Sequence, residues 1–381
     1  MGLPKKTAGK TSFRGFDGVG QLLVIGFDGT AMSPQLAEML TWVQPAGVIL
    51  FARNIVNAQQ THRLLRDCQA CVHEPLFTMV DLEGGRVDRF RNVTGPAPSA
   101  ADVFATGNRK LYHRHGQVFG KACCAMGFNT DLAPVLDLAF EASRAVMSSR
   151  AFSIQPKDVI VYAREFLAGL RSAGVTGSGK HFPGLGEGNL DSHHDLPVIR
   201  KGFNALWDED LVPYRVMKRE LPMVLVNHAN YPAVTRDRLP ASLSQYWIRE
   251  VLRKKIGYRG LIVSDDLEMG GVLKAAPVEE AAMEFVRAGG DLCLICREPG
   301  GIERAFAKMT KECERDARFR RRVTESVKRV QLFKRKHARF LRIGSAPSEE
   351  KIARLSRQLW EFSEQVRYSA MPGATAAGAG R

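Results

Sequence analysis

Short apolar, β-branched runs alternate along the chain with longer stretches in which apolar residues recur at helical spacing. This alternation is typical of parallel βα units. We expect strands in eight runs: 21–27, 46–51, 76–81, 130–137, 175–182, 222–229, 260–266 and 291–296. We expect helices between them at about 33–43, 57–73, 110–126, 157–173, 207–219, 244–256 and 277–288, followed by a basic helical stretch over about 301–342.

The number of βα repeats predicts the fold. Eight repeats in 381 residues are what a closed (β/α)8 barrel requires, whereas a doubly wound sheet usually ends at about five or six strands. We therefore predict an α/β protein with a single TIM-type (β/α)8 barrel over residues 20–343, preceded by an N-terminal extension at 1–19. Residues 344–381 follow the helical extension as a C-terminal tail, with disorder after about Ser369, because its Gly and Ala content cannot build a core.

Polar residues stand at the carboxyl ends of several expected strands. Asp81, His181, His228 and Asp265 each lie at the end of one apolar run. The carboxyl ends of the strands of a barrel meet at one rim, where active sites form. We therefore expect these four side chains to surround one pocket.

The composition indicates a globular protein, and the charge is unevenly distributed along the chain. With 45% hydrophobic and 25% charged residues, the chain is typical of a globular protein and not of a disordered one. The formal net charge is +15, and residues 301–343 contribute +10 of it through 15 basic and 5 acidic residues. We interpret this stretch as the solvated face of a helix and expect no nucleic-acid partner, because no DNA-binding motif accompanies it. The alternative, a nucleic-acid binder, predicts DNA binding that depends steeply on salt.

The ends and the apolar runs of the sequence indicate where the protein works. No run reaches the roughly 18 apolar residues of a membrane span, and the basic start at 1–10 is followed by neither an apolar region nor a cleavage site. We therefore expect a cytoplasmic protein, acting as a monomer.

The chain has seven cysteines, which we expect to be reduced thiols. Cys68 with Cys71 and Cys293 with Cys296 have the C-x-x-C spacing of some zinc and redox sites. A strand over 291–296 would turn the second pair to opposite faces, so that both could not hold one ion. We therefore expect no metal.

Three segments carry candidate chemistry. Residues 81–89 crowd two glycines, several carboxylates and two arginines directly after a strand, which suits contact with a polar ligand. Residues 260–269 are a buried strand ending in Asp265 and Asp266, of which alternation allows at most one to point into the barrel mouth, while the other caps the next segment.

The third segment, 180–197, is a long glycine-rich loop with three histidines, one lysine and three carboxylates. Long loops of this kind are often lids or binding loops. A metal site formed by His193, His194 and Asp195 is an alternative that we do not favour, because adjacent residues rarely aim at one ion.

Together these segments resemble glycoside hydrolase family 3, and specifically its bacterial β-N-acetylglucosaminidase branch. The resemblance extends from about residue 20 to 300, with the three motifs in the family's order. It implies that Asp265 is the catalytic nucleophile, that His193 is the acid/base of this branch and that Asp191 pairs with it. It also implies that the terminal sugar is bound by Asp81, Arg89, Arg150, Lys180 and His181, that His228 lines the pocket, and that no cofactor is needed.

Two positions depart from the family pattern. Leu185 stands where a histidine is typical, and Leu82 where a glutamine is usual. Leu185 is expected to alter contacts beyond the catalytic sugar, so the identity of the leaving group stays open.

The resulting hypothesis is a retaining exo-β-N-acetylglucosaminidase acting on cell-wall fragments of the GlcNAc-anhydro-MurNAc type. Such an enzyme needs a carboxylate to trap the anomeric carbon and a second group to protonate the leaving oxygen. Histidine, with a reference pKa of about 6.5, exchanges a proton at neutral pH, and Asp191 would support its charged form. Glu187 in the same loop is the rival acid.

Three alternatives remain. Another family 3 exo-glycosidase, such as a β-glucosidase, would commonly have a second domain, for which the roughly 80 residues after the last strand are too few. A GlcNAc phosphorylase stays open, because a histidine tolerates an anionic acceptor better than a carboxylate does. The third alternative, a barrel that binds sugar without cleaving it, is disfavoured by the presence of Asp265, Asp191 and His193.

Overall fold

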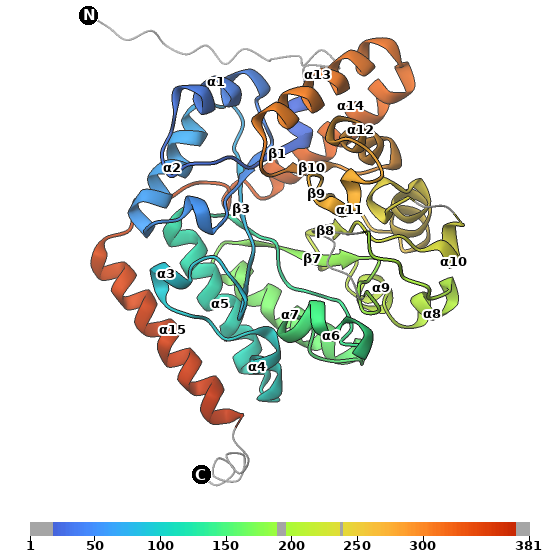
Figure 1. Cartoon of the computed structure of the whole chain (residues 1–381). Helices are drawn as coiled ribbons and strands as arrows, with labels where there is room; N and C mark the ends of the chain where they lie inside the picture. The colour runs from blue at the N-terminus through green and yellow to red at the C-terminus, as the bar shows by residue number, and fades with distance from the viewer. Residues whose placement is uncertain (1–17, 189–195, 237–238, 371–381) are drawn as a thin grey trace, which may run out of the picture.

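A computed structural model describes residues 18–188, 196–236 and 239–370, and its parallel strands close into a barrel (Figure 1). Around the barrel the order is β1-β10-β9-β8-β7-β6-β3-β2. The strands are β1 (Leu23–Ile25), β2 (Gly47–Ile49), β3 (Phe77–Val80), β6 (Thr130–Asp131), β7 (Thr176–Phe182), β8 (Met223–Val226), β9 (Leu261–Asp266) and β10 (Leu292–Ile295). The prediction of a (β/α)8 barrel is confirmed, and each strand lies within its expected run.

Helices surround the barrel and follow the expected spacing. The α-helices are α1 (Pro34–Val43), α2 (Ala58–Ala70), α3 (Arg91–Thr94), α4 (Ala100–Ala105), α5 (Arg109–Met126), α6 (Arg144–Met147), α7 (Pro156–Ser172), α8 (Phe203–Asp208), α9 (Val212–Val216), α10 (Pro232–Thr235), α11 (Gly270–Leu273), α12 (Val278–Ala288), α13 (Pro299–Arg315), α14 (Ala317–Lys336) and α15 (Glu349–Ser369). The short 3-10 helices are η1 (Val19–Leu22), η2 (Ala52–Asn54), η3 (Glu141–Ser143), η4 (Ser148–Arg150) and η5 (Ala241–Leu243), and η6 (Tyr246–Lys255) is a π-helix.

Local sequence explains where several elements begin and end. The Ser33 side chain accepts a hydrogen bond from the Leu36 amide at the start of α1, and Asn57 caps α2 in the same way. Strand β6 is shorter than the run 130–137, because Pro134 lacks the amide hydrogen that a central strand donates.

The prediction of one continuous helix over 207–219 is wrong, because two short helices lie there instead. Helix α8 ends at Asp208 and α9 begins at Val212, with Pro213 in its first turn. Asp210 lies between them and turns inward, where its carboxylate accepts a hydrogen bond from Lys201 at 2.8 Å. The break between the two helices therefore coincides with the buried, paired carboxylate of Asp210.

A small hairpin follows β3. Its antiparallel strands β4 (Leu82–Gly84) and β5 (Val87–Asp88) are joined through Gly84 and Gly85, both with positive φ. At Gly84 a Cβ would come within 2.0 Å of the Pro98 carbonyl oxygen, so only glycine fits. The sequence indicated a polar loop here, and the hairpin gives it a fixed geometry.

The end of the described chain contains a 21-residue helix, α15, within the segment expected to form a tail. It packs against α3, α4 and α5, and it runs along the outside of the molecule in Figure 1. Leu355 and Leu359 of α15 meet Leu82 and Phe119 around a small apolar cavity, so the helix lies over the base of the hairpin. The predicted boundary at residue 344 stays a prediction, and residues 371–381 lie outside the described chain.

In the described ranges, no helix combines the length and the apolar character needed to cross a membrane.

Candidate active site

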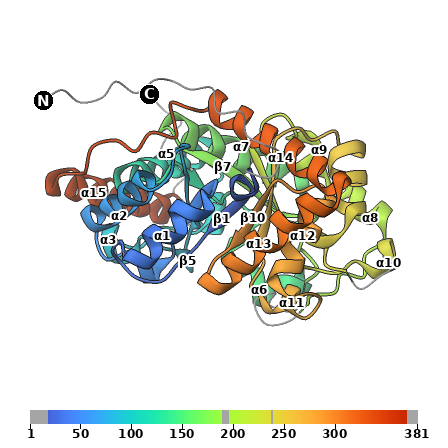
Figure 2. The ribbon, with the colours of Figure 1, turned by 90° about the horizontal axis from the view of Figure 1, so that it is seen from above.

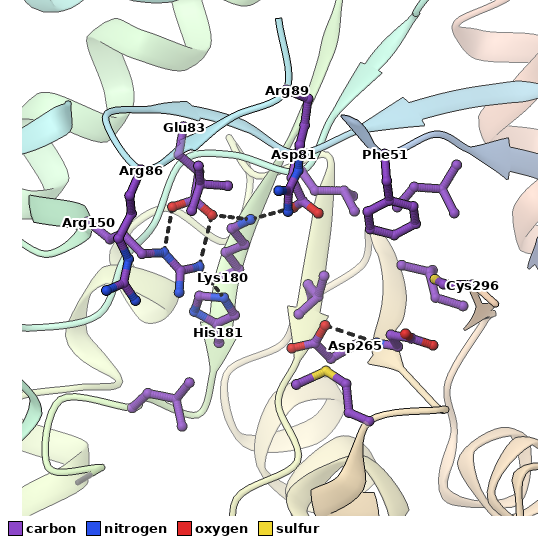
Figure 3. Close-up of a pocket in the computed structure, with 18 of the residues that line it drawn as sticks. Phe51, Asp81, Glu83, Arg86, Arg89, Arg150, Lys180, His181, Asp265 and Cys296 are labelled. Carbon is purple, nitrogen blue, oxygen red and sulfur yellow. Dashed lines mark hydrogen bonds and ion pairs between the residues drawn. The ribbon is translucent and has the colours of Figure 1, made fainter. Parts of the chain in front are cut away.

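A cavity of about 220 Å³ opens at the carboxyl ends of the barrel strands. Figure 3 shows charged side chains converging on it from several strands and from the hairpin. Of the predicted site residues, six line this cavity: Asp81, Arg89, Arg150, Lys180, His181 and Asp265. The structure thus brings together residues from four segments that are far apart in the sequence.

One side of the cavity is a chain of paired charges. Lys180, in β7, places its Nζ 2.7 Å from Asp81 Oδ1 and 2.6 Å from Glu83 Oε1. Arg150 holds Glu83 from the other side through two hydrogen bonds, at 2.7 Å from Nε and 2.9 Å from Nη2. Such a bidentate pair fixes the orientation of both side chains. The carboxylates and cations are therefore held in place before any ligand arrives.

This pairing determines the charge states. Burial by itself would raise the pKa of Asp81 and Glu83, but Lys180, with Arg89 for Asp81 and Arg150 for Glu83, holds both pKa values below their ordinary range. Burial would lower the pKa of Lys180, and its two carboxylate partners raise it instead. The groups remain ionised at neutral pH, and they can offer both donors and acceptors to the hydroxyls of a sugar.

His181 completes this side. Its Nδ1 lies 2.6 Å from Asp137 Oδ2, and its Nε2 lies 3.1 Å from Arg150 Nη2. Because the guanidinium only donates, Nε2 accepts that bond and the proton lies on Nδ1, where it is donated to Asp137. Asp137 therefore fixes the tautomer and the ring orientation of His181.

Arg89 lines the cavity beside Phe51, with its guanidinium 5.8 Å from the ring centroid. Its buried Nε has no hydrogen-bond partner in the part of the chain that the structure describes. A buried donor of this kind costs free energy unless a ligand satisfies it.

Asp265 and Asp266 end β9 and both border the cavity. Asp265 Oδ1 accepts a hydrogen bond from the Asp266 amide at 2.9 Å, and Asp266 Oδ1 accepts one from the Glu268 amide at 3.0 Å. Asp266 thus caps the following turn, as expected, while it also borders the cavity. Asp265 faces the ion-paired side of the cavity across the barrel mouth (Figure 3).

Burial raises the pKa of Asp266 to about 6, with smaller contributions from the nearby charges of Glu268 and Asp265. Since this value lies above the ordinary 3.8, the folded protein binds the proton more tightly than the unfolded chain does. The stability that this proton contributes is complete below about pH 4 and is lost as the pH rises through about 6. We expect Asp266→Asn to be more stable than the wild type at pH 8, by up to about 3 kcal/mol.

The measurement is the free energy of unfolding of both proteins at pH 4.5 and pH 8. Asparagine can still accept the Glu268 amide hydrogen bond, so the variant isolates the charge. An equal difference between the two proteins at both pH values would contradict the assignment.

His228 is not among the residues that line this cavity, and its predicted place at the pocket stays a prediction. It is fully buried, with Nδ1 2.7 Å from the Ser242 hydroxyl and Nε2 2.9 Å from the Asp266 carbonyl oxygen. A carbonyl only accepts, so Nε2 carries the proton. His228 thus supports the end of β9 through the Asp266 carbonyl.

Asp191 and His193 lie outside the described residues, as does the alternative metal set His193, His194 and Asp195. The base of their loop is described and is anchored to the site. The Leu185 amide donates to Asp137 Oδ1 at 2.8 Å, and the Tyr231 hydroxyl donates to the Gly184 carbonyl at 2.7 Å. Leu185 itself lines the cavity.

Glu187, the alternative to His193 as the acid, does not line the cavity. Its Oε1 lies 3.9 Å from Lys201 Nζ. Within the described ranges, no cluster of His, Cys, Asp or Glu is arranged to hold a metal ion, and the seven thiols are free.

Sequence reasoning missed two important residues. Glu83 is the partner shared by Lys180 and Arg150, and Asp137 orients His181 and the loop base. Both had a signal, because Glu83 belongs to the polar segment 81–89 and Asp137 ends an expected strand. Their partners could not be inferred from that position alone.

Comparisons with known proteins identify a family with this fold. A family model described as the glycosyl hydrolase family 3 N terminal domain matches residues 17–332. A β-hexosaminidase of Alkalilimnicola ehrlichii is 39% identical over 74% of this chain and 82% of the relative, and one of Idiomarina loihiensis is 31% identical over 90% and 98%. The structure of a family 3 β-N-acetylglucosaminidase from Paenibacillus sp. FPU-7 superposes with a TM-score of 0.82 at 30% identity, covering 91% of this chain and 68% of that chain.

Proposed function

This chain belongs to glycosyl hydrolase family 3 and is a glycosidase of the β-hexosaminidase class, and on that premise we propose that it removes terminal β-linked N-acetylglucosamine with retention of configuration. The observation that carries the proposal is the position of Asp265, opposite a preorganised set of charged groups in one small cavity. A cavity of about 220 Å³ suits one sugar ring and therefore an exo mode of attack.

In the proposed mechanism, Asp265 attacks the anomeric carbon and forms a covalent glycosyl-aspartate, while the bond to the leaving oxygen breaks. A second group gives that oxygen a proton and later removes one from the attacking water. We assign this role to His193, paired with Asp191, on the loop whose base is held by Asp137 and Tyr231. Water then displaces Asp265, and the second inversion restores the original configuration.

In this proposal the terminal sugar is bound by Asp81, Arg89, Arg150, Lys180 and His181, together with Glu83. Donors and acceptors are already fixed in these residues, so little conformational entropy is lost when the hydroxyls bind. The apolar floor of the cavity, formed by Leu132, Leu225 and Leu294, closes the pocket beneath the ring.

The mouth of the cavity supports an acidic leaving group. Three exposed arginines line it: Arg53, Arg86 and Arg297. Cations at a pocket mouth favour anionic ligands and increase their encounter rate. Fragments of peptidoglycan, with a carboxylate-bearing sugar after N-acetylglucosamine, are the substrate that we propose. A cytoplasmic location belongs to the same proposal, and the free thiols agree with a reducing compartment.

The test compares release of 4-nitrophenol from its β-N-acetylglucosaminide and from its β-glucoside, with and without phosphate. We expect hydrolysis selective for the N-acetyl substrate. Loss of the acid/base typically lowers the rate by about 100- to 10,000-fold, and we expect His193→Ala to fall within this range. NMR of the first product formed should show the β-anomer.

Each arm can contradict one part of the proposal. Activity on the glucoside alone would replace the substrate assignment, and an α-product would exclude the covalent mechanism. Turnover that requires phosphate would indicate a phosphorylase. No activity on either substrate would favour a barrel that only binds sugar.

A further inference from the structure

A second cavity, of about 900 Å³, lies at the opposite end of the barrel from Asp265. It is lined where β7, β8 and β9 begin, by Thr176, Pro222 and Leu261, whereas the catalytic cavity is lined where the strands end. Helices α7 and α14 supply further parts of its lining. Figure 2 shows α7 and α14 on one side of the barrel and α6 and α11, beside the catalytic cavity, on the other. The mechanism uses no residue of this second cavity.

The lining of this cavity is strongly basic. Among the described residues that form it, one is a carboxylate, Glu220, and it is paired with Arg164 at 2.6 Å. The lysines and arginines that line it are Arg164, Arg171, Lys218, Arg219, Arg259, Arg329 and Lys336. Arg171, Arg219, Arg259 and Lys336 have no ion pair with any residue that the structure describes. Like charges gathered around one hollow repel each other, and a bound anion removes that cost.

The charge behind this lining is also under-compensated. Buried Asp291 faces three guanidinium groups, those of Arg253, Arg322 and Arg329. Burial lowers the pKa of both Arg322 and Arg253. The positive charge of Arg329 lowers both pKa values further. Arg322 also pairs with Glu325. Two carboxylates therefore face three guanidinium groups, and the cluster keeps a net positive charge beside the cavity.

Two further observations distinguish this hollow from an ordinary basic surface. Thr176 belongs to its lining, and the buried hydroxyl of this residue has no hydrogen-bond partner in the described part of the chain. One wall is aromatic, with Phe333 and His337 stacked at 4.1 Å between ring centroids and Phe340 beyond them. The cavity volume lies in the range of small-molecule sites, about 300–1,000 Å³.

We propose that this cavity binds a small polyphosphorylated anion. Phosphate groups offer several charges within a few bond lengths, which matches cations that face one another across a hollow. A concave site favours such a molecule over duplex DNA, which needs an extended basic face. The proposal also accounts for part of the basic stretch 301–343, because Arg329 and Lys336 lie on the cavity.

The experiment is a calorimetric titration of the full chain with inorganic tripolyphosphate at about 0.15 M salt. We expect saturable binding with a Kd below about 1 mM. The cavity variant is Arg219→Glu/Arg259→Glu, both exposed residues. The control is Lys328→Glu/Arg335→Glu, which makes the same change of net charge on α14 outside the cavity.

The cavity variant should weaken binding by about tenfold or more, while the control should change it by less than about threefold. Both should hydrolyse the N-acetylglucosaminide as the wild type does, which verifies folding independently of binding. Equal losses in the two variants, or no saturable binding by the wild type, would overturn the proposal. Tighter binding of a 20-base-pair duplex than of tripolyphosphate, lost in the control, would also overturn it and indicate a nucleic-acid surface on α14.

Discussion

Asp265→Asn should lower kcat for the N-acetylglucosaminide by at least about 10,000-fold, because an amide cannot form the glycosyl ester through which the reaction proceeds. Asparagine has nearly the same size and can still accept the hydrogen bond from the Asp266 amide. The fold and the affinity for N-acetylglucosamine should therefore be retained. The measurements are kcat, the thermal unfolding temperature, and sugar binding by calorimetry.

The neighbouring carboxylate provides a matched control. Asp266→Asn makes the same chemical change one residue away, at a side chain that caps the turn to Glu268. It should reduce kcat by less than about 100-fold. In Asp265→Ala, added azide should restore release of 4-nitrophenol, because it can attack from the face that the carboxylate has left. Wild-type turnover by Asp265→Asn, or equal losses at the two positions, would reject Asp265 as the nucleophile.

The second large effect is expected at Lys180. Lys180→Met keeps the length of the side chain but leaves the buried carboxylate of Glu83 and the partly buried carboxylate of Asp81 without their shared cation. Removing one partner from a buried ion pair costs about 3–5 kcal/mol, and we expect this loss at neutral pH together with loss of sugar binding. Lys180 lowers the pKa of both carboxyls, so the loss should shrink as they take up protons in acid.

The control for Lys180 is Arg164→Met. Arg164 pairs with Glu220 at a similar distance, 2.6 Å, but both side chains are about 40% exposed to solvent (43% and 39%). This variant should cost less than about 1 kcal/mol, because water compensates for the lost pair. Chemical denaturation of both variants at pH 7.5 and pH 4 gives the comparison. Equal costs at the two positions would show that the buried cluster is not held by Lys180.

The fold could be predicted from sequence because its information is local and repeated. Most barrel strands are short apolar runs, several of them with β-branched residues, and most helices have clear apolar periodicity. Eight repeats are therefore recognisable even where one helix, 207–219, breaks at Asp210. Parallel strands then place their carboxyl ends at one rim. Asp81, His181 and Asp265 follow from that rule without reference to any relative.

The partners within the site could not be predicted in this way. Alternation gives the direction of a side chain only inside a strand, and β8 ends at Val226, two residues before His228. His228 therefore lies beyond the strand, where its Nε2 contacts the Asp266 carbonyl oxygen at the end of β9. Arg150 lies in a short 3-10 turn without periodicity, so the family resemblance alone indicated it. Its pairing with Glu83 depends on the three-dimensional course of the hairpin.

The position of α15 has a consequence for how the enzyme is made. The amino-terminal part of a protein emerges from the ribosome first, and domains begin to fold during synthesis. The hairpin that carries Glu83 emerges early, whereas Leu355 and Leu359, which cover its base, belong to the last helix of the described chain. A chain that ended before that helix would contain every proposed catalytic residue and still lack the packing beneath the hairpin that carries Glu83.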